Sequence, residues 1–88
     1  MTYRFISDPG HGWLEVPLAE LSILPYPPSS YSYRNDGFAY LEEDCDAPLF
    51  LRAKFGDESS DWHKNLVDVY EASTAIRGYA RFPSRRSV

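Results

Sequence analysis

The loop around His11 combines residue types that enzymes and metal sites use. The imidazole stands between Gly10 and Gly12, three residues after Asp8. Because an imidazole titrates near neutral pH and offers two nitrogens, His11 is a candidate general base or metal ligand. A histidine in such a turn also caps a backbone carbonyl or packs against a neighbouring ring, here Trp13, and we favour this structural role.

Cys45 lies between two carboxylates, Asp44 and Asp46. A thiolate at this position would be a nucleophile, or a metal ligand together with His11 or His63. Adjacent negative charges raise the pKa of a thiol and so disfavour the thiolate, which argues against an activated cysteine. We therefore expect Asp46 to cap a helix and Cys45 to be a small buried apolar side chain.

The consecutive carboxylates of Glu42 and Glu43 are a third candidate, since a pair of acids can act as general acid and base. Neighbours on a strand point to opposite faces, so we do not expect these two to flank one bond. Gly10 and Gly12 lack the third glycine and the following helix of a phosphate-binding loop. One cysteine and two histidines also fall short of a zinc finger. The sequence thus predicts no catalytic residue, no metal site and no cofactor.

Arg77, Tyr79 and Arg81 alternate in a β-prone stretch and would share one face of a strand. Such a basic and aromatic stripe would bind an acidic partner or a phosphate. The alternative, which we favour, is a surface of weak ion pairs with Asp68 and Glu71 on a neighbouring strand.

Charge is unevenly distributed along the 88 residues, whose formal net charge is −4. Residues 1–35 carry a net charge of −1, residues 36–71 carry −7 and residues 77–88 carry +4. Nucleic acid binding requires a basic surface, so we expect no direct contact with nucleic acid. An acidic segment suits a basic protein partner, although it also serves simply to keep a small protein soluble. The candidate partner-binding residues are Glu42, Glu43, Asp44, Asp57, Glu58 and Asp61, with Trp62 and Tyr26 as aromatic anchors.

Length and composition indicate one small globular domain. Of the residues, 43% are hydrophobic and 16% aromatic, enough to build a core in a chain of this size. A single cysteine excludes an internal disulfide. No apolar run approaches the length of a membrane span or a signal peptide, so we expect a cytoplasmic protein without membrane contact.

Hydrophobic patterning, proline and glycine predict strands interrupted by helices. The expected strands are residues 3–7, 13–16, 31–34, 38–41, 66–70 and 76–82, the expected helices are residues 17–24 and 47–55, and residues 57–61 are expected to be a polar loop. These elements predict an α+β fold, with an antiparallel sheet of four to six strands and two short helices on one face. Residues 1–83 would form this single small domain, followed by a basic C-terminal tail at 84–88.

The run Asn-Asp-Gly at 35–37, between two β-prone segments, predicts a hairpin. A two-residue loop would pair Tyr33 with Tyr40. A three-residue loop would pair Arg34 with Phe38. Both registers stay open at this point.

Three stretches of the sequence resemble one family. They read FISDPGHGWL at residues 5–14, YSYR at 31–34 with YLEEDCD at 40–46, and IRGYARF at 76–82. The family consists of small uncharacterised proteins of phages, plasmids and other bacterial mobile elements. It has no established activity, so the resemblance transfers no catalytic residue.

The resemblance implies a setting in which small acidic proteins inhibit host defence. On this basis we expect a non-enzymatic inhibitor, in particular an anti-CRISPR protein that binds a CRISPR effector complex in the bacterial host cell. Its acidic surface would occupy a basic groove that otherwise holds DNA. Two alternatives remain open: a small metal-binding protein or enzyme centred on His11, Cys45 and His63, and an accessory protein that self-associates through a sheet edge.

Overall fold

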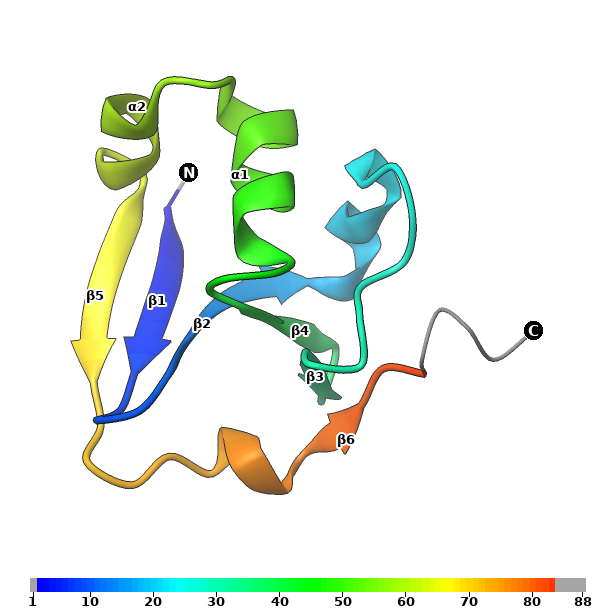
Figure 1. The fold of residues 1–88 in the computed structure, drawn as a ribbon, viewed down its shortest axis with the longest axis vertical. Coiled ribbons are helices and arrows are strands. Elements are labelled where there is room, and N and C mark those ends of the chain that lie inside the picture. The colour runs from blue at the N-terminus through cyan, green and yellow to red at the C-terminus, as the bar shows by residue number, and fades with distance from the viewer. Residues whose placement is uncertain (1, 84–88) are drawn as a thin grey trace.

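The computed structural model describes residues 2–83, and within them six strands form one sheet (Figure 1). The strands are β1 (Tyr3–Ser7), β2 (Gly12–Pro17), β3 (Tyr33–Asn35), β4 (Phe38–Glu42), β5 (Leu66–Tyr70) and β6 (Ala80–Arg81). The helices are α1 (Ala47–Phe55), α2 (Ser59–His63) and the 3-10 helices η1 (Leu18–Ile23) and η2 (Ile76–Gly78). The order across the sheet is β5-β1-β2-β4-β3-β6. The predicted α+β class is confirmed, and the tail expected at 84–88 lies outside the described residues.

One strand pair departs from the expected antiparallel pattern. β1 and β5 run parallel, with Tyr3 opposite Leu66 and Ser7 opposite Tyr70, whereas the other neighbouring pairs in residues 2–83 are antiparallel. After β4 the chain passes through α1 and α2 and re-enters the sheet beside the start of β1 (Figure 1). Because a helical crossover returns the chain in the same direction, β5 pairs in parallel and the sheet is mixed.

The β3–β4 hairpin has the shorter of the two predicted loops. Tyr33 lies opposite Tyr40. The loop therefore consists of Asp36 and Gly37, whose φ angles are 49° and 84°. Positive φ at both central positions is typical of a type I′ turn, whose twist matches that of the two strands.

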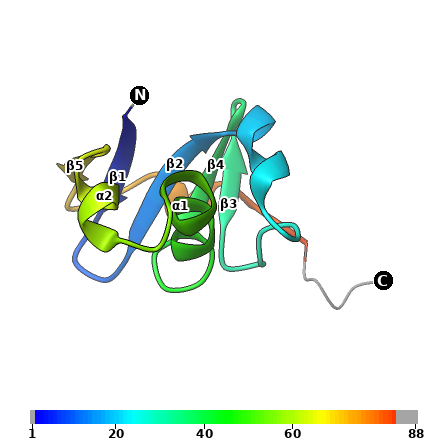
Figure 2. The same ribbon diagram turned by 90° about the horizontal axis from the view of Figure 1, so that it is seen from above.

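α1, α2 and η1 lie on one face of the sheet, as the view in Figure 2 shows for α1 and α2. α1 packs Ala47, Phe50 and Leu51 against buried strand residues such as Leu14 and Leu41. Side chains of η1 and α2 join the margin of this core. None of the helices within residues 2–83 has the length and apolar character needed to cross a membrane.

The opposite face carries a second core, rich in aromatic side chains. Trp13, Tyr33 and Tyr40 are buried there together with Ile6 and Ile76. Ile76 comes from the segment that leads from β5, at one edge of the sheet, to β6, at the other. This crossing segment is what covers the second face.

The continuous strand predicted at 76–82 is wrong. Ile76–Gly78 is a 3-10 turn, closed by a hydrogen bond of 3.0 Å from the Gly78 amide to the Ala75 carbonyl. Within the described residues β6 pairs through Ala80 and Arg81 with β3, which is itself short. The 3-10 turn buries Ile76 in the second core, and this burial stabilises the turn over a continuous strand. Arg77, Tyr79 and Arg81 nevertheless lie against the same face, the one with the second core: Arg77 lies over Trp13, Arg81 over Tyr33, and the ring centroid of Tyr79 is 5.2 Å from that of Tyr40.

Two short helices also differ from the predicted limits. The helix expected at 17–24 is the 3-10 helix η1, with Pro17 in the N-cap position. The polar loop expected at 57–61 is shortened because α2 begins at Ser59. Neither difference changes which face the helices cover.

Candidate functional site

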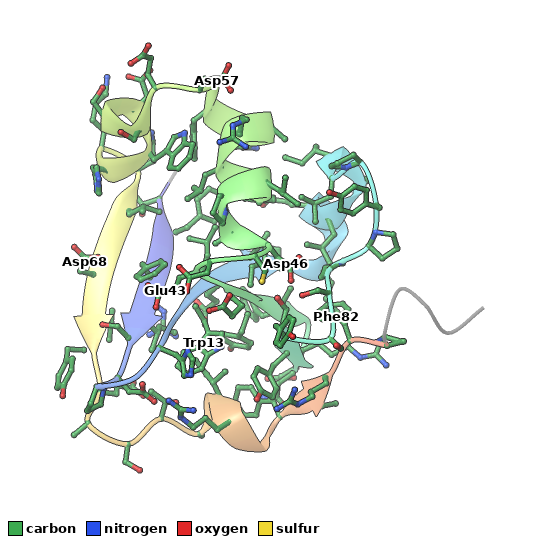
Figure 3. The ribbon with its side chains drawn as sticks, in the orientation of Figure 1. Trp13, Glu43, Asp46, Asp57, Asp68 and Phe82 are labelled. Atoms are coloured by element: carbon green, nitrogen blue, oxygen red, sulfur yellow. The ribbon has the colours of Figure 1, made fainter. Side chains whose placement is uncertain are left out.

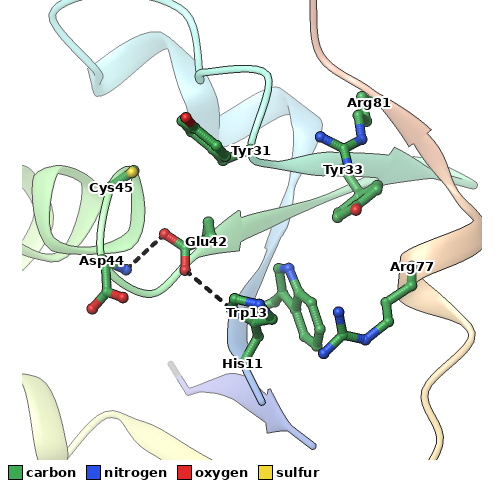
Figure 4. Close-up of a pocket in the computed structure, with 9 residues that line it drawn as sticks. All are labelled: His11, Trp13, Tyr31, Tyr33, Glu42, Asp44, Cys45, Arg77 and Arg81. Atoms are coloured by element: carbon green, nitrogen blue, oxygen red, sulfur yellow. Dashed lines mark hydrogen bonds and ion pairs between the residues drawn. The ribbon is translucent and has the colours of Figure 1, made fainter.

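A pocket on one face of the sheet and a groove on the other lie close to the end of β4. The aromatic pocket has a volume of about 320 Å³ and is lined by His11, Trp13, Tyr31, Tyr33, Glu42, Asp44, Cys45, Arg77 and Arg81 (Figure 4). The apolar groove has a volume of about 250 Å³ and is lined by Phe5, Glu43, Ala47, Pro48, Leu51, Trp62, His63, Leu66 and Asp68. Glu42 thus belongs to the pocket and its neighbour Glu43 to the groove.

Trp13 and Tyr33 form the aromatic wall of the pocket, with ring centroids 6.4 Å apart and planes inclined at 71°. The guanidinium carbon of Arg77 lies 5.3 Å from the Trp13 ring centroid, and that of Arg81 lies 5.1 Å from the Tyr33 ring centroid. Each cation is stabilised by the face of a ring. The carboxylate of Glu42 stands on the opposite side of the pocket (Figure 4).

Asp8 and Arg77 tie the loop before β2 to the segment that crosses the sheet. Two hydrogen bonds join them, from Arg77 Nε to Asp8 Oδ2 at 2.9 Å and from Nη2 to Oδ1 at 3.0 Å. The same carboxylate accepts the backbone amides of Gly10 and His11. The hydrogen bond from Arg77, followed by those from the two amides, holds the pKa of Asp8 well below its usual range. Within the described residues Arg77 thus pairs with Asp8, and not with Asp68 or Glu71 as expected from the sequence.

Glu42 is a nearly buried carboxylate, only 8% exposed, at the last position of β4. Its Oε1 accepts the backbone amide of Asp44 at 2.9 Å. Its Oε2 lies 3.9 Å from His11 Nδ1. His11 in turn lies beside Trp13, with ring centroids 6.0 Å apart, which agrees with the predicted packing.

The thiol of Cys45 is exposed, contrary to the predicted burial. The chain leaves the sheet at Glu42, so the residues that follow lie on the rim of the pocket and not in the core. Partial burial of the sulfur, a hydrogen bond with Glu42 and the flanking carboxylates raise the pKa of this thiol. The expectation that the thiolate is disfavoured agrees with this direction.

Asp46 occupies the N-cap position of α1, but its side chain makes no capping bond within the described residues. The carboxylate is 1% exposed and bonds instead to the turn before β3. It accepts the Ser29 amide at 3.0 Å, the Ser29 hydroxyl at 2.7 Å and the Ser32 hydroxyl. Ser32 Oγ also accepts the Glu42 amide at 2.9 Å. Asp46 therefore does not cap the helix as predicted. Its carboxylate connects the start of α1 through Ser32 to the end of β4.

His11, Glu42 and Glu43 each place one ligand-type atom within 4.8 Å of the other two. Glu42 lines the pocket on one face and Glu43 lines the groove on the other, but one oxygen of each carboxylate lies within 4.8 Å of the other where β4 ends. Glu43 is held there by a hydrogen bond of 3.0 Å from its amide to the Gly12 carbonyl. The pairing of β2 with β4 creates this cluster, and no local sequence pattern reveals that pairing.

The metal site considered from the sequence, with His11, Cys45 and His63, does not assemble. His11 and Cys45 line the aromatic pocket, whereas His63 lines the apolar groove. Within residues 2–83, the cluster of potential metal ligands consists of His11, Glu42 and Glu43, and contains neither Cys45 nor His63.

The acidic residues predicted to contact a partner form two groups at the two ends of α1, as the positions of Glu43 and Asp57 in Figure 3 illustrate. The first group is Glu42, Glu43 and Asp44, and the second is Asp57, Glu58 and Asp61. The nine residues of α1 between them span about 13 Å. In the second group Asp57 pairs with Arg52 at 3.1 Å and Asp61 pairs with Lys64 at 2.9 Å. The six residues therefore do not make one continuous patch.

The two predicted aromatic anchors lie on different surfaces. Trp62 is half-buried, donates its Nε1–H to the Gly56 carbonyl at 2.7 Å and lines the apolar groove. Tyr26 is 46% exposed and lines a separate hollow with Phe82. Trp62 is thus the anchor that shares a site with one of the predicted acids, Glu43.

The apolar groove has a hydrophobic floor and an acidic rim. Phe5, Leu51 and Leu66 contribute apolar surface, and the carboxylates of Glu43 and Asp68 stand beside it. Neither carboxylate makes an ion pair within residues 2–83. Asp68 was not among the predicted contact residues. It reaches the groove because the parallel register of β5 places it opposite Phe5.

No family model, curated protein or solved structure matches this chain. The fold and the site define a small α+β protein with an aromatic pocket and an apolar groove that meet at the end of one strand. The resemblance to proteins of mobile elements stays a prediction.

Proposed function

We propose that the protein is a non-enzymatic inhibitor that binds a basic protein partner through the apolar groove. The observation that carries this proposal is the hydrophobic floor flanked by Glu43 and Asp68, which have no cationic partner among residues 2–83. A partner segment that presents an apolar side chain next to Lys or Arg would complement both features. Trp62, oriented by its bond to Gly56, is the aromatic anchor of this contact.

The charge of the surface supports a basic partner. Residues 2–83 contain thirteen acidic and seven basic residues. Five of these basic side chains already pair with an acid inside this part of the chain: Arg4, Arg52, Lys54, Lys64 and Arg77. Exposed carboxylates such as Asp36, Asp44 and Glu58 therefore add to a negative field, which speeds association with a positively charged protein.

The class of partner follows from the family resemblance. We take it to be a nucleic-acid-binding complex of a bacterial defence system, in the first place a CRISPR effector complex. A groove that holds DNA presents Lys and Arg, which suit the acidic rim. An inhibitor seated there would exclude DNA by occupancy and would need no catalytic residue.

The test compares two charge reversals of equal size. Asp68→Lys alters the rim of the groove, whereas Asp36→Lys alters an exposed acid at the tip of the β3–β4 hairpin. Tagged variants are used to retain CRISPR effector complexes from bacterial lysates, with mass spectrometry of the retained subunits and elution by rising salt. We expect retention by the original protein and by Asp36→Lys, and loss with Asp68→Lys. The proposal is wrong if no effector subunit is retained, or if both reversals act alike.

Self-association is a second candidate function, favoured by the edge strand β5. Within residues 2–83 no strand pairs with its outer edge. Val67 is 47% exposed and Tyr70 is 65% exposed on this strand. Unpaired edges with apolar side chains are sites of strand addition. Sedimentation equilibrium measures the mass of the protein over a range of concentrations. A concentration-dependent dimer that Val67→Lys abolishes would support self-association, and a monomer at every concentration would contradict it.

A further inference from the structure

We propose that His11, Glu42 and Glu43 form a binding site for one divalent transition-metal ion, of the kind represented by Zn²⁺ or Co²⁺. The site would use one imidazole nitrogen and one oxygen from each of two carboxylates. This proposal shares the Glu43 carboxylate with the proposed protein contact, but it is tested by metal binding to the isolated chain, so the outcome for one proposal does not decide the other.

The distances suit a metal with a small adjustment. One ligand atom from each residue already lies within 4.8 Å of the other two. Metal–ligand bonds of about 2.0–2.2 Å in tetrahedral geometry place neighbouring ligand atoms about 3.4 Å apart. His11 Nδ1 and Glu42 Oε2 lie 3.9 Å apart. The side chains of His11 and Glu43 are not buried, so changes of their torsions can bring the ligand atoms closer together.

The backbone around the three ligands is held in place by contacts outside the cluster. The carbonyl of His11 accepts the Asp8 amide at 2.9 Å, and the Gly12 carbonyl accepts the Glu43 amide at 3.0 Å. The Asp8–Arg77 pair fixes the same loop from the other side. The Asp44 amide binds one oxygen of Glu42 and leaves the other oriented toward His11. Such outer contacts orient metal ligands in known sites.

Gly12 provides space that the cluster needs. A Cβ at this position would lie 3.2 Å from Glu43 Oε2 and 2.6 Å from the Phe5 ring. The carboxylate of Glu43 therefore packs over the bare backbone of Gly12, directly beside His11.

The electrostatics of the cluster also call for a cation. Glu42 is only 8% exposed, and two further carboxylates follow it in the chain. Burying a carboxylate is costly unless a cation compensates its charge. Within the described residues the ion-pair partner of Glu42 is His11, at 3.9 Å, which is charged only when it is protonated. A bound divalent ion would satisfy both glutamates, and its remaining coordination positions would open toward the aromatic pocket, which His11 and Glu42 line.

The two histidines of the chain offer a matched pair of variants. His11→Ala removes a proposed ligand, whereas His63→Ala removes the same side chain from the groove, away from the cluster. Both histidines are exposed, so neither variant should unfold the protein. Glu43→Gln and Asp44→Asn form a second pair, with one carboxylate inside the cluster and its exposed neighbour outside it.

The full chain, freed of metal with a chelator, is titrated with Co²⁺ and followed by visible absorption, and with Zn²⁺ by calorimetry. We expect one equivalent to bind. Both His11→Ala and Glu43→Gln should weaken binding by at least about tenfold, while His63→Ala and Asp44→Asn leave it unchanged. Circular dichroism verifies the fold of each variant. Absence of saturable binding, or equal weakening within either matched pair, would overturn the proposal.

Discussion

Arg77 reaches across 69 positions of the chain to bind Asp8 through two hydrogen bonds, while its guanidinium rests 5.3 Å from the centroid of Trp13. The contact fastens the segment that crosses the second face of the sheet to the loop that carries His11. The Arg77 side chain thus connects the segment that covers the aromatic core with the loop and the tryptophan that line the pocket.

The first prediction concerns the pH dependence of the Asp8–Arg77 pair. Because Arg77 lowers the pKa of Asp8, its contribution to stability is fully present above the ordinary pKa of aspartate, near 3.9, and is lost as the pH falls toward the lowered value. Arg77→Gln should lower the urea midpoint at pH 7, and the difference from the original protein should shrink in acid. Arg34→Gln, which removes a cation without an acid partner in residues 2–83, is the control. If the difference in urea midpoint between Arg77→Gln and the original protein stayed constant with pH, the proposed contribution of the Asp8–Arg77 pair to stability would be wrong.

Asp46 is the second target, because its buried carboxylate accepts three hydrogen bonds from Ser29 and Ser32. Asp46→Ala leaves these donors unsatisfied, and we expect a loss of about 2–4 kcal/mol in the free energy of unfolding. Asp44→Ala, at an exposed position two residues away, should change it by less than about 0.5 kcal/mol. Urea denaturation measures both. Equal effects would mean that the buried link does not stabilise the fold.

The third prediction compares two glycines. Gly12→Ala would place a Cβ 2.6 Å from the Phe5 ring, so we expect a destabilisation of about 1–3 kcal/mol. At Gly78 an added Cβ meets nothing within 4 Å in the described part of the chain, and its φ is not in the left-handed region. Gly78→Ala should therefore be close to neutral. Thermal unfolding of the two variants tests the difference, and a neutral Gly12→Ala would show that the ring moves aside at no cost.

Cys45 provides the fourth prediction, because it is exposed and its pKa is nevertheless raised. Iodoacetamide should label it completely in the folded protein, with a rate that rises through a midpoint at higher pH than in the urea-unfolded chain. Glu42→Gln should lower that midpoint, since a charged hydrogen-bond partner is removed. If labelling requires unfolding, or if the folded and unfolded midpoints coincide, the described environment of the thiol is wrong.

Local chemistry accounts for what the sequence predicted well. The hairpin at 35–37 follows from residues that tolerate positive φ, and α1 lies where Pro48 and Gly56 indicate its beginning and end. Strands β1, β2 and β5 coincide with runs of β-branched and aromatic residues. In each case the determining interactions lie within a few residues of one another.

The candidate sites depended on contacts between distant segments. Asp68 joins the groove through the parallel register of β5, and Glu43 meets His11 through the pairing of β2 with β4. The burial of Ile76 in the second core overrode the strand tendency of its own segment. None of these contacts leaves a local signature, since strand order and register depend on which apolar faces can be buried together over the whole chain. The sequence by itself determined the elements and the acidic character of this protein. The tertiary structure decided which carboxylates lie next to an apolar groove, and which lie next to a histidine.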